Sequence, residues 1–255
     1  MSLSWLDRHT LLVHPRRIVL ERKPWRGPAQ RFTAEVQPAQ PGEADWQPAL
    51  TATSTLLAAQ SHAYGRLRIV VANQFVRFAL LPWSDSVLGV KARLGMAKAL
   101  LRNSLGEQAE QLDIALDCAS FGLNGLAAGI PRSLLAALRQ MAKSRRLRLD
   151  SLQPRLTSDL ASCRLSLSDG CVVFPDDGWL TLSGRRDNNI SLLRNHRTHA
   201  EPEQLSNELS GLLAAENATV NRKKVRIFSS HTWPKMLGDW EIEQKMSILE
   251  GGAHA

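Results

Sequence analysis

Two short turns of this sequence are candidates for phosphate or metal chemistry, and only one of them contains residues suited to it. This turn reads Pro175-Asp176-Asp177-Gly178 and lies between two apolar runs. Its carboxylates could bind Mg²⁺, and Gly178 would let backbone N–H groups approach a phosphate. The same residue types are what an ordinary hairpin turn requires. The composition favours an ordinary turn, and Asp176, Asp177 and Gly178 stay as a residual cofactor-binding candidate.

The other turn, His14-Pro15-Arg16-Arg17, comes near the start of the chain and lacks this chemistry. It contains no carboxylate and no glycine, and Pro15 removes a backbone donor. Arg16 and Arg17 could attract an anion, but a guanidinium cannot replace a metal-binding acid. This turn therefore does not support a metal–phosphate site.

Other reactive side chains have simpler interpretations. His196 and His199 are spaced like two metal ligands, but no cysteine or acidic cluster accompanies them. Cys118 follows a strand pattern without a neighbouring base, which favours a buried structural thiol. No Walker loop, Rossmann glycine motif or Gly-x-Ser-x-Gly occurs. We expect no metal site and no catalytic residue.

The two turns belong to a pattern of elements that occurs twice, in residues 11–72 and 171–229. Each copy has an apolar run, the turn, a second apolar run, a third strand, a helix and one more strand. Two β-β-β-α-β units predict an α/β protein with two ribonuclease-H-like subdomains, of the two-lobed kind that often clamps a nucleotide. We place the first in residues 1–165, with an inserted hairpin and helix, and the second, reduced one in residues 166–250.

Two local patterns complete this prediction. The apolar runs Leu67–Ala72 and Phe75–Leu81 are separated by a short polar turn, which predicts a hairpin. Pro82 ends the pairing, and an amphipathic helix is expected over residues 86–102. Near the end of the chain, Trp233–Gln244 is expected to form a last short helix.

The composition excludes several classes of protein. Three cysteines without a Cys-x-x-Cys pair argue against a disulfide framework and indicate a reducing compartment. No apolar run reaches the roughly 18 residues needed to cross a bilayer, and no signal-peptide pattern is seen, so we expect a cytoplasmic protein. The net charge of +8 favours an acidic partner, anionic lipid or nucleic acid, and is equally compatible with a solvated arginine-rich surface. Nucleic acid is disfavoured because no recognition motif or interleaved aromatic residues accompany the charge.

The segment Leu67–Ser84, LRIVVANQFVRFALLPWS, with the helix that follows it, resembles a known group of proteins. These are the cytoplasmic actin-like proteins of type IV pilus assembly and type II secretion, namely the PilM family and the cytoplasmic domain of the GspL family. FtsA is more loosely similar. The resemblance implies that the two subdomains have an actin-like (ASKHA) arrangement. The chain lacks the transmembrane and periplasmic segments of GspL, so we expect a layout closer to PilM.

The resemblance also implies a scaffold that couples a cytoplasmic motor ATPase to an inner-membrane partner. PilM-type proteins bind the short cytoplasmic tail of a bitopic membrane protein and can bind ATP, and GspL-type proteins contact the secretion ATPase. In actin-like ATPases the first turn carries an Asp and glycines, and a late segment that contacts adenosine is glycine-rich. Here the first turn has neither, and residues 229–233 contain no glycine pair. We expect a degenerate nucleotide site without a cofactor; an ATPase of the same fold that binds ATP and Mg²⁺ is the alternative.

Basic and aromatic residues are the candidates for binding such a partner. Arg16, Arg17 and Arg22 provide positive charge that would complement an acidic tail. Trp83, beside a proline at the end of a strand, is a suitable anchor because tryptophan is enriched at interface hot spots. The sequence therefore predicts a non-catalytic cytoplasmic adaptor, held at the inner membrane by a bitopic assembly protein, with a basic nucleic-acid-binding protein as a further alternative.

Overall fold

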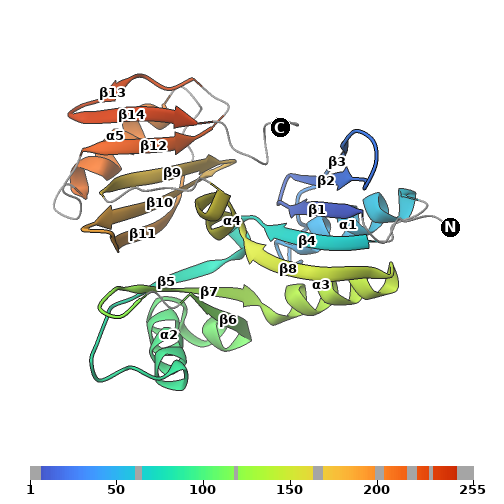
Figure 1. Cartoon of the computed structure of the whole chain (residues 1–255), viewed down its shortest axis with the longest axis horizontal. Helices are drawn as coiled ribbons and strands as arrows, with labels where there is room; N and C mark the ends of the chain where they lie inside the picture. Colours follow the sequence, from blue (N-terminus) through green and yellow to red (C-terminus); the bar gives the residue numbers. More distant parts are fainter. Residues whose placement is uncertain are drawn as a thin grey trace.

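The strands of the chain form two large sheets, which lie in separate lobes, and one small sheet (Figure 1). The computed structural model describes residues 7–60, 65–117, 120–162, 169–198, 204–216, 223–229 and 232–245. The two lobes correspond to the two halves of the doubled sequence pattern. Among the helices in these residues, none is both long and apolar enough to cross a membrane.

The first lobe is built on a five-stranded mixed sheet. Its elements are β1 (Arg8–Val13), β2 (Arg17–Lys23), β3 (Gln30–Glu35), α1 (Gln47–Ala59), β4 (Gly65–Val71), α3 (Arg132–Ser144) and β8 (Leu147–Pro154). The strand order is β3-β2-β1-β4-β8, with β1, β2 and β3 antiparallel and β4 and β8 parallel to β1. Alternate residues such as Leu11, Leu20 and Ile69 form one buried face, against which α1 and α3 pack.

The second lobe repeats this arrangement. Its elements are β9 (Gly170–Asp176), β10 (Trp179–Arg186), β11 (Asn189–Arg197), α5 (Leu205–Ala215), β12 (Lys224–Phe228), β13 (Met236–Leu237) and β14 (Trp240–Lys245). The order β11-β10-β9-β12-β14 matches that of the first sheet, and β13 adds an outer strand. Leu209 and Leu213 of α5 pack on Val173 and Ile227. The predicted α/β class with two β-β-β-α-β units is confirmed.

An inserted unit, residues 77–131, separates β4 from α3. Its elements are β5 (Arg77–Leu81), α2 (Val90–Leu105), the 3₁₀ turn η3 (Gly106–Gln111), β6 (Leu112–Asp117) and β7 (Gly125–Pro131). The strands form a small antiparallel sheet in the order β5-β7-β6. The unit lies below both large sheets in the view of Figure 1, with α2 on its outer side.

The predicted hairpin between β4 and β5 is wrong. β4 has β1 on one side and β8 on the other, so it has no free edge on which β5 could pair. The 3₁₀ turn η2 (Asn73–Phe75) instead leads the chain into the inserted unit, where β5 pairs with β7. The apolar composition of the two runs predicted strands correctly but could not identify their partners.

The predicted helix over Trp233–Gln244 is also wrong, because this segment contains β13 and β14. Buried Trp240 is followed by exposed Glu241 and half-buried Ile242, which is the alternation of a strand. Gly238, with φ +57°, makes the tight turn between the two strands. β14 runs parallel to β12 and completes the sheet where the first lobe has β8.

The helix α4 (Arg155–Ser162) follows β8 and lies between the lobes (Figure 1). Its Leu156 packs in a buried cluster with Phe174 and Phe228 of the second lobe, and Phe78 of the inserted unit packs against the same cluster. The two lobes and the inserted unit therefore share a buried core. The expected boundary between residues 165 and 166 lies outside the described residues.

Candidate functional site

The two turns singled out in the sequence meet each other directly between the lobes. His14 follows β1 of the first lobe, and Asp176 ends β9 of the second lobe. The Nε2 atom of His14 lies 2.9 Å from Oδ1 of Asp176, and the backbone N–H of Arg16 donates to Nδ1 of His14 over 3.1 Å. Because Nδ1 accepts a hydrogen bond, Nε2 carries the proton and donates it to the carboxylate.

Arg155 at the start of α4 completes this contact. Its Nη1 donates to the second carboxylate oxygen of Asp176 over 2.9 Å, and its Nε donates to Asp159 over 3.3 Å. The side chains of His14, Arg155, Asp159 and Asp176 are each at most 5% exposed. We call these four residues the inter-turn cluster. It joins the first lobe, α4 and the second lobe through charged and hydrogen-bonded groups that are almost completely buried.

The environment of Asp176 keeps its carboxylate ionised. Burial alone would raise its pKa, but the hydrogen bond from His14 and the charge of Arg155 outweigh this effect and hold the pKa well below its usual range. Its neighbour Asp177 is half exposed and lies 3.9 Å from both His14 and Arg16. Gly178 adopts φ +74°, a conformation that favours glycine and closes the hairpin.

The donor set of this site does not fit a metal ion. His14, Asp176 and Asp177 offer ligand atoms within 4.8 Å of one another, which is close enough for a shared cation. Both oxygens of Asp176, however, already accept hydrogen bonds, and Nε2 of His14 is a donor in this arrangement. A cation would have to compete with Arg155 and His14 for Asp176 and would need the other tautomer of His14, so the exposed Asp177 is the most accessible ligand here.

A second set of hydrogen bonds fixes the lobes beside the inter-turn cluster. The side chain of Asn73, in η2, donates to Thr181 over 3.2 Å and accepts from the backbone N–H of Leu156 over 2.9 Å. Its backbone carbonyl accepts from Asn195 over 3.1 Å. Asn73 is buried and connects α4 to two strands of the second lobe. The segment predicted as a hairpin turn is therefore an inter-lobe contact.

The predicted partner-binding arginines do not form one patch. Arg16 is 70% exposed and lies near Asp177, whereas Arg22 lies toward the other end of β2. Arg22 donates to Asp7 through Nη2 over 2.8 Å and through Nε over 3.2 Å. Burial of Asp7 is outweighed by these bonds and by the N–H of Trp25, so that its pKa is lowered. Arg17 begins β2 next to the turn.

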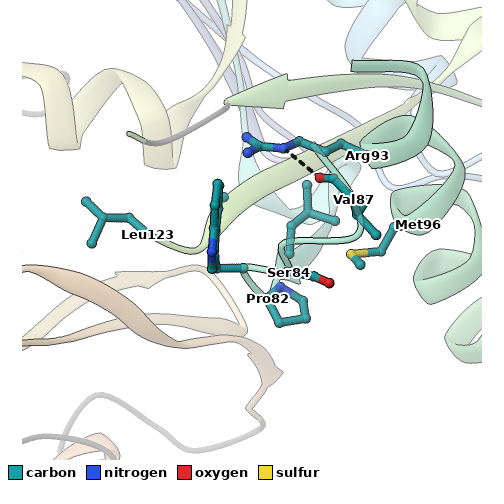
Figure 2. A pocket seen from close by; sticks show the side chains of 9 residues that line it. Pro82, Ser84, Val87, Arg93, Met96 and Leu123 are labelled. Carbon is teal, nitrogen blue, oxygen red and sulfur yellow. Dashed lines mark hydrogen bonds between the residues drawn. The ribbon is translucent and has the colours of Figure 1, made fainter. Parts of the chain in front are cut away.

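Trp83 lies apart from these arginines, on the loop between β5 and α2. Its ring packs edge-on against Phe121, with centroids 4.6 Å apart, and the guanidinium of Arg93 lies 5.0 Å from its centroid. Arg93 also donates to the carbonyl of Val87 (Figure 2). The hollow bounded by Pro82, Trp83, Val87 and Met96 has a volume of about 10 Å³, which is room for about one water molecule.

A larger groove crosses the inserted unit beside β6. Its volume is about 500 Å³, in the range of sites that bind ligands. Leu112 and Ile114 contribute apolar surface. Lys98, Arg102 and Arg132 contribute positive charge, and Glu110, which lies 3.7 Å from Arg102, offsets part of it. Among the described strands β6 pairs only with β7, so its other edge carries unpaired backbone groups. An extended segment with apolar and acidic residues would match this surface.

The remaining predicted candidates are accounted for differently. His196 bonds to Glu208 of α5 over 2.8 Å, which gives it a structural partner. His199 and Cys118 lie outside the described residues, as do Ser230 and His231 in the predicted adenosine segment.

Arg155, Asp159 and Asn73 are not among the site residues predicted from the sequence. Arg155 and Asp159 are spaced i, i+4 on a helix, which usually indicates an exposed ion pair. The sequence offered one sign that Arg155 and Asp159 could contact both lobes: they lie immediately before the second β-β-β-α-β unit. Their burial depends on the packing of the two lobes, which no local pattern encodes.

No protein-family model matches this sequence, and no curated protein matches it. Several solved structures do share its fold. The cytoplasmic domain of EpsL, an inner-membrane component of the type II secretion system of Vibrio cholerae, covers 94% of this chain and 90% of its own, with a TM-score of 0.60 and 11% identity. A PilM–PilN type IV pilus biogenesis complex matches 94% of this chain and 88% of its own, with a TM-score of 0.59 and 14% identity.

A third similar structure is a Bacteroides thetaiotaomicron protein with an actin-like ATPase fold and unknown function. It covers 90% of this chain and 84% of its own, with a TM-score of 0.61 and 11% identity. At these identities the likeness concerns the fold. It confirms the predicted resemblance at that level: the chain has an actin-like fold with two ribonuclease-H-like subdomains, and its structural neighbours include GspL/EpsL-type and PilM-type proteins.

Proposed function

We propose that this chain is a non-catalytic adaptor of a type IV pilus or type II secretion assembly. It acts on the cytoplasmic side of the inner membrane and is held there by a bitopic membrane protein. The observation that carries this proposal is the inter-turn cluster, because the residues of the two turns make their hydrogen bonds with each other and with Arg155. A secretion or pilus motor ATPase is a further partner consistent with this role.

Several features support the non-catalytic part of the proposal. Asp176 is held by His14 and by Arg155, so a metal ion would have to compete with these internal contacts. Arg155 supplies from within the chain the positive charge that a bound cation would otherwise bring. Asn73 and the Leu156 cluster fix the same two lobes, which opposes the opening that nucleotide exchange requires. No cofactor is needed in this interpretation.

The partner part of the proposal is supported by the structural neighbours and by the groove beside β6. EpsL is an inner-membrane component of its secretion system, and the PilM neighbour was solved in a complex with PilN. The groove has apolar walls, three cations and an unpaired strand edge within the described residues, and these suit an extended amphipathic segment. Arg16 and Arg17, which were predicted from the sequence, are a second candidate for the docking site.

Affinity capture of solubilised membrane proteins from the source cells tests this function. The tagged wild-type chain is compared with an Arg102→Glu/Arg132→Glu variant, an Arg16→Glu/Arg17→Glu variant and the control Arg139→Glu, which changes an exposed charge on α3. We expect capture of a bitopic protein whose cytoplasmic segment, as a synthetic peptide, binds the wild type and the control but not the groove variant.

Loss of peptide binding only in the Arg16→Glu/Arg17→Glu variant would move the docking site to the first turn. Capture of no membrane protein, together with co-purifying nucleic acid that is released by salt, would contradict the adaptor function.

A further inference from the structure

Exposed apolar side chains are most frequent in the inserted unit, among the residues that the structure describes. Among the described residues the large apolar side chains that stand out as exposed are Trp25, Leu88, Val90, Phe121 and Met236. Leu88, Val90 and Phe121 are 57%, 72% and 79% exposed and all belong to the inserted unit. Trp25 and Met236 lie singly, one on each lobe. Isolated apolar residues are common on surfaces, but a group of this kind indicates contact with another apolar phase.

The contacts of Trp83 involve Phe121 and the loop segment that precedes Leu88. Phe121 packs against Trp83, and Val87, which immediately precedes Leu88, lines the same small hollow as Trp83. Arg93 of α2 joins the loop by bonding to the Val87 carbonyl (Figure 2). We call Trp83, Leu88, Val90 and Phe121 the apolar tip. Trp83 and Phe121 hold each other through their ring contact, and Arg93 links α2 to the loop that carries Leu88.

Positive charge surrounds the apolar tip. The sequence of α2 contains Lys91, Arg93, Lys98 and Arg102 and no acidic residue. Lys91, Lys98 and Arg102 are spaced i, i+7 and i+11, so they follow one side of the helix, and all three are exposed. The acids nearest in sequence are Asp85 in the loop, Glu107 and Glu110 after α2, and Asp117 at the end of β6. Glu110 pairs with Arg102 over 3.7 Å, so the positive charge on this side of α2 lies mainly at Lys91 and Lys98.

The shape of this surface favours a flat partner over an inserted peptide. The hollow beneath Trp83, about 10 Å³ in volume, is too small to receive a side chain. Leu88, Val90 and Phe121 are instead largely exposed. Helix α2 lies on the side of the inserted unit away from both large sheets (Figure 1). Apolar and aromatic side chains that project beside a row of lysine and arginine match the interface of an anionic bilayer.

We infer that the apolar tip and the cationic side of α2 form a docking surface for an anionic lipid bilayer, so that this protein touches the membrane directly as well as through a partner. Leu88, Val90 and Phe121 enter the headgroup region, and Lys91 and Lys98 lie against lipid phosphates. The inference goes beyond the proposed function. The apolar tip contributes no residue to the groove beside β6, although Lys98 and Arg102 of the cationic side also line that groove. Bilayer contact would orient that groove along the membrane surface.

Vesicle flotation tests this inference. The purified chain is mixed with vesicles of phosphatidylcholine alone or of equal parts phosphatidylcholine and phosphatidylglycerol, at low and high salt. We expect flotation with the anionic vesicles only, and less of it at high salt. The Leu88→Ser/Val90→Ser/Phe121→Ser variant should bind at least about tenfold more weakly. Lys91→Glu should lower binding by about fivefold or more.

Met236→Ser and Lys143→Glu are matched controls, because they change an exposed apolar residue and an exposed lysine outside the inserted unit. Both should float like the wild type. No flotation of the wild type with anionic vesicles, or equal flotation of the triple variant and Met236→Ser, overturns the inference. If vesicles do not bind but the triple variant loses capture of the membrane protein, the tip is a protein interface and the lipid assignment is wrong. If the triple variant no longer floats with anionic vesicles but still binds the peptide from the membrane partner, lipid docking is supported and the adaptor function is unaffected.

Discussion

The inter-turn cluster and the inserted unit use polar and apolar side chains in opposite ways. In the cluster, charged groups are buried and satisfied by other residues of the chain, as shown by Asp176 between His14 and Arg155. In the inserted unit, apolar groups such as Phe121 and cations such as Lys98 face outward. The centre of the fold therefore keeps its binding groups for internal contacts, and the inserted unit offers surface to other molecules.

In the proposed adaptor role, this difference would let an actin-like fold serve without nucleotide. When the turns bind each other, the relative position of the lobes depends on the sequence and not on a ligand. The chain then works as a fixed platform on which the inserted unit is presented. If this is correct, changes in the cluster should alter stability strongly, and changes on the inserted unit should alter binding with little effect on stability.

The largest loss of stability is expected for Arg155→Met. This change keeps the volume of the side chain but leaves the carboxylates of Asp159 and Asp176 buried without their cation, which typically costs about 3–5 kcal/mol. Urea unfolding at neutral pH measures it. Arg155→Lys should lose about half as much, since it keeps the charge but not both contacts. The control Arg148→Met, which breaks an exposed pair with Asp150, should change the free energy of unfolding by less than about 1 kcal/mol.

A pH-dependent effect is expected for Asp176→Asn. The amide keeps the shape of the side chain but loses the charge, and hydrogen bonds to a charged group contribute about 2 kcal/mol. The pKa of Asp176 is lower in the folded chain than its unfolded value of about 3.9. Its contribution is therefore complete at neutral pH and is lost as the pH falls below about 4.

Unfolding free energies of the wild type and Asp176→Asn should accordingly differ at neutral pH and converge in acid. A difference that is the same at neutral and acidic pH would show that the charge of Asp176 does not stabilise the cluster.

A smaller loss of about 1–3 kcal/mol is expected for Asn73→Ala. The change leaves the buried N–H of Leu156 without its acceptor and removes the donor to Thr181. Thermal unfolding compares it with Asn207→Ala, an exposed position on α5 that should have almost no effect. Equal melting temperatures for the two variants would mean that Asn73 does not hold the lobes together.

The smallest effect is expected for the Leu88→Ser/Val90→Ser pair. Both side chains are more than half exposed in the folded chain, so their replacement should change the free energy of unfolding by less than about 0.5 kcal/mol each. Circular dichroism melting gives the comparison. A loss as large as that of Asn73→Ala would show that the apolar tip is part of the core and would weaken its assignment as a binding surface.

Local signals were sufficient for the strands and the repeated order of elements. The turn residues around Pro15 and Gly178 and the apolar runs beside them predicted both hairpins of the doubled unit. Pairing over longer distances was not predictable in this way. The position of β5 depends on β1 and β8 occupying both edges of β4, and β14 depends on a free edge of β12.

The sequence predicted only part of the candidate site, because the rest of the site depends on contacts between distant parts of the chain. The sequence identified Asp176 and the lack of an acid beside His14, but not that these residues bind each other. That contact depends on how the lobes pack. The burial of Arg155 could not be predicted either, because the i, i+4 spacing of Arg155 and Asp159 does not indicate whether the pair is buried or exposed.

Thermal unfolding of the wild-type chain with ATP, in the presence and absence of Mg²⁺, tests the central claim most directly. A nucleotide present at 100 times its dissociation constant would add about 2.7 kcal/mol, which corresponds to a rise of about 5–10 °C in melting temperature for a chain of this size. Because the turns bind each other, we expect no rise that depends on Mg²⁺. A rise of that size that requires Mg²⁺ and is lost in Asp177→Ala, where the exposed acid can be removed without disturbing the fold, would contradict the claim.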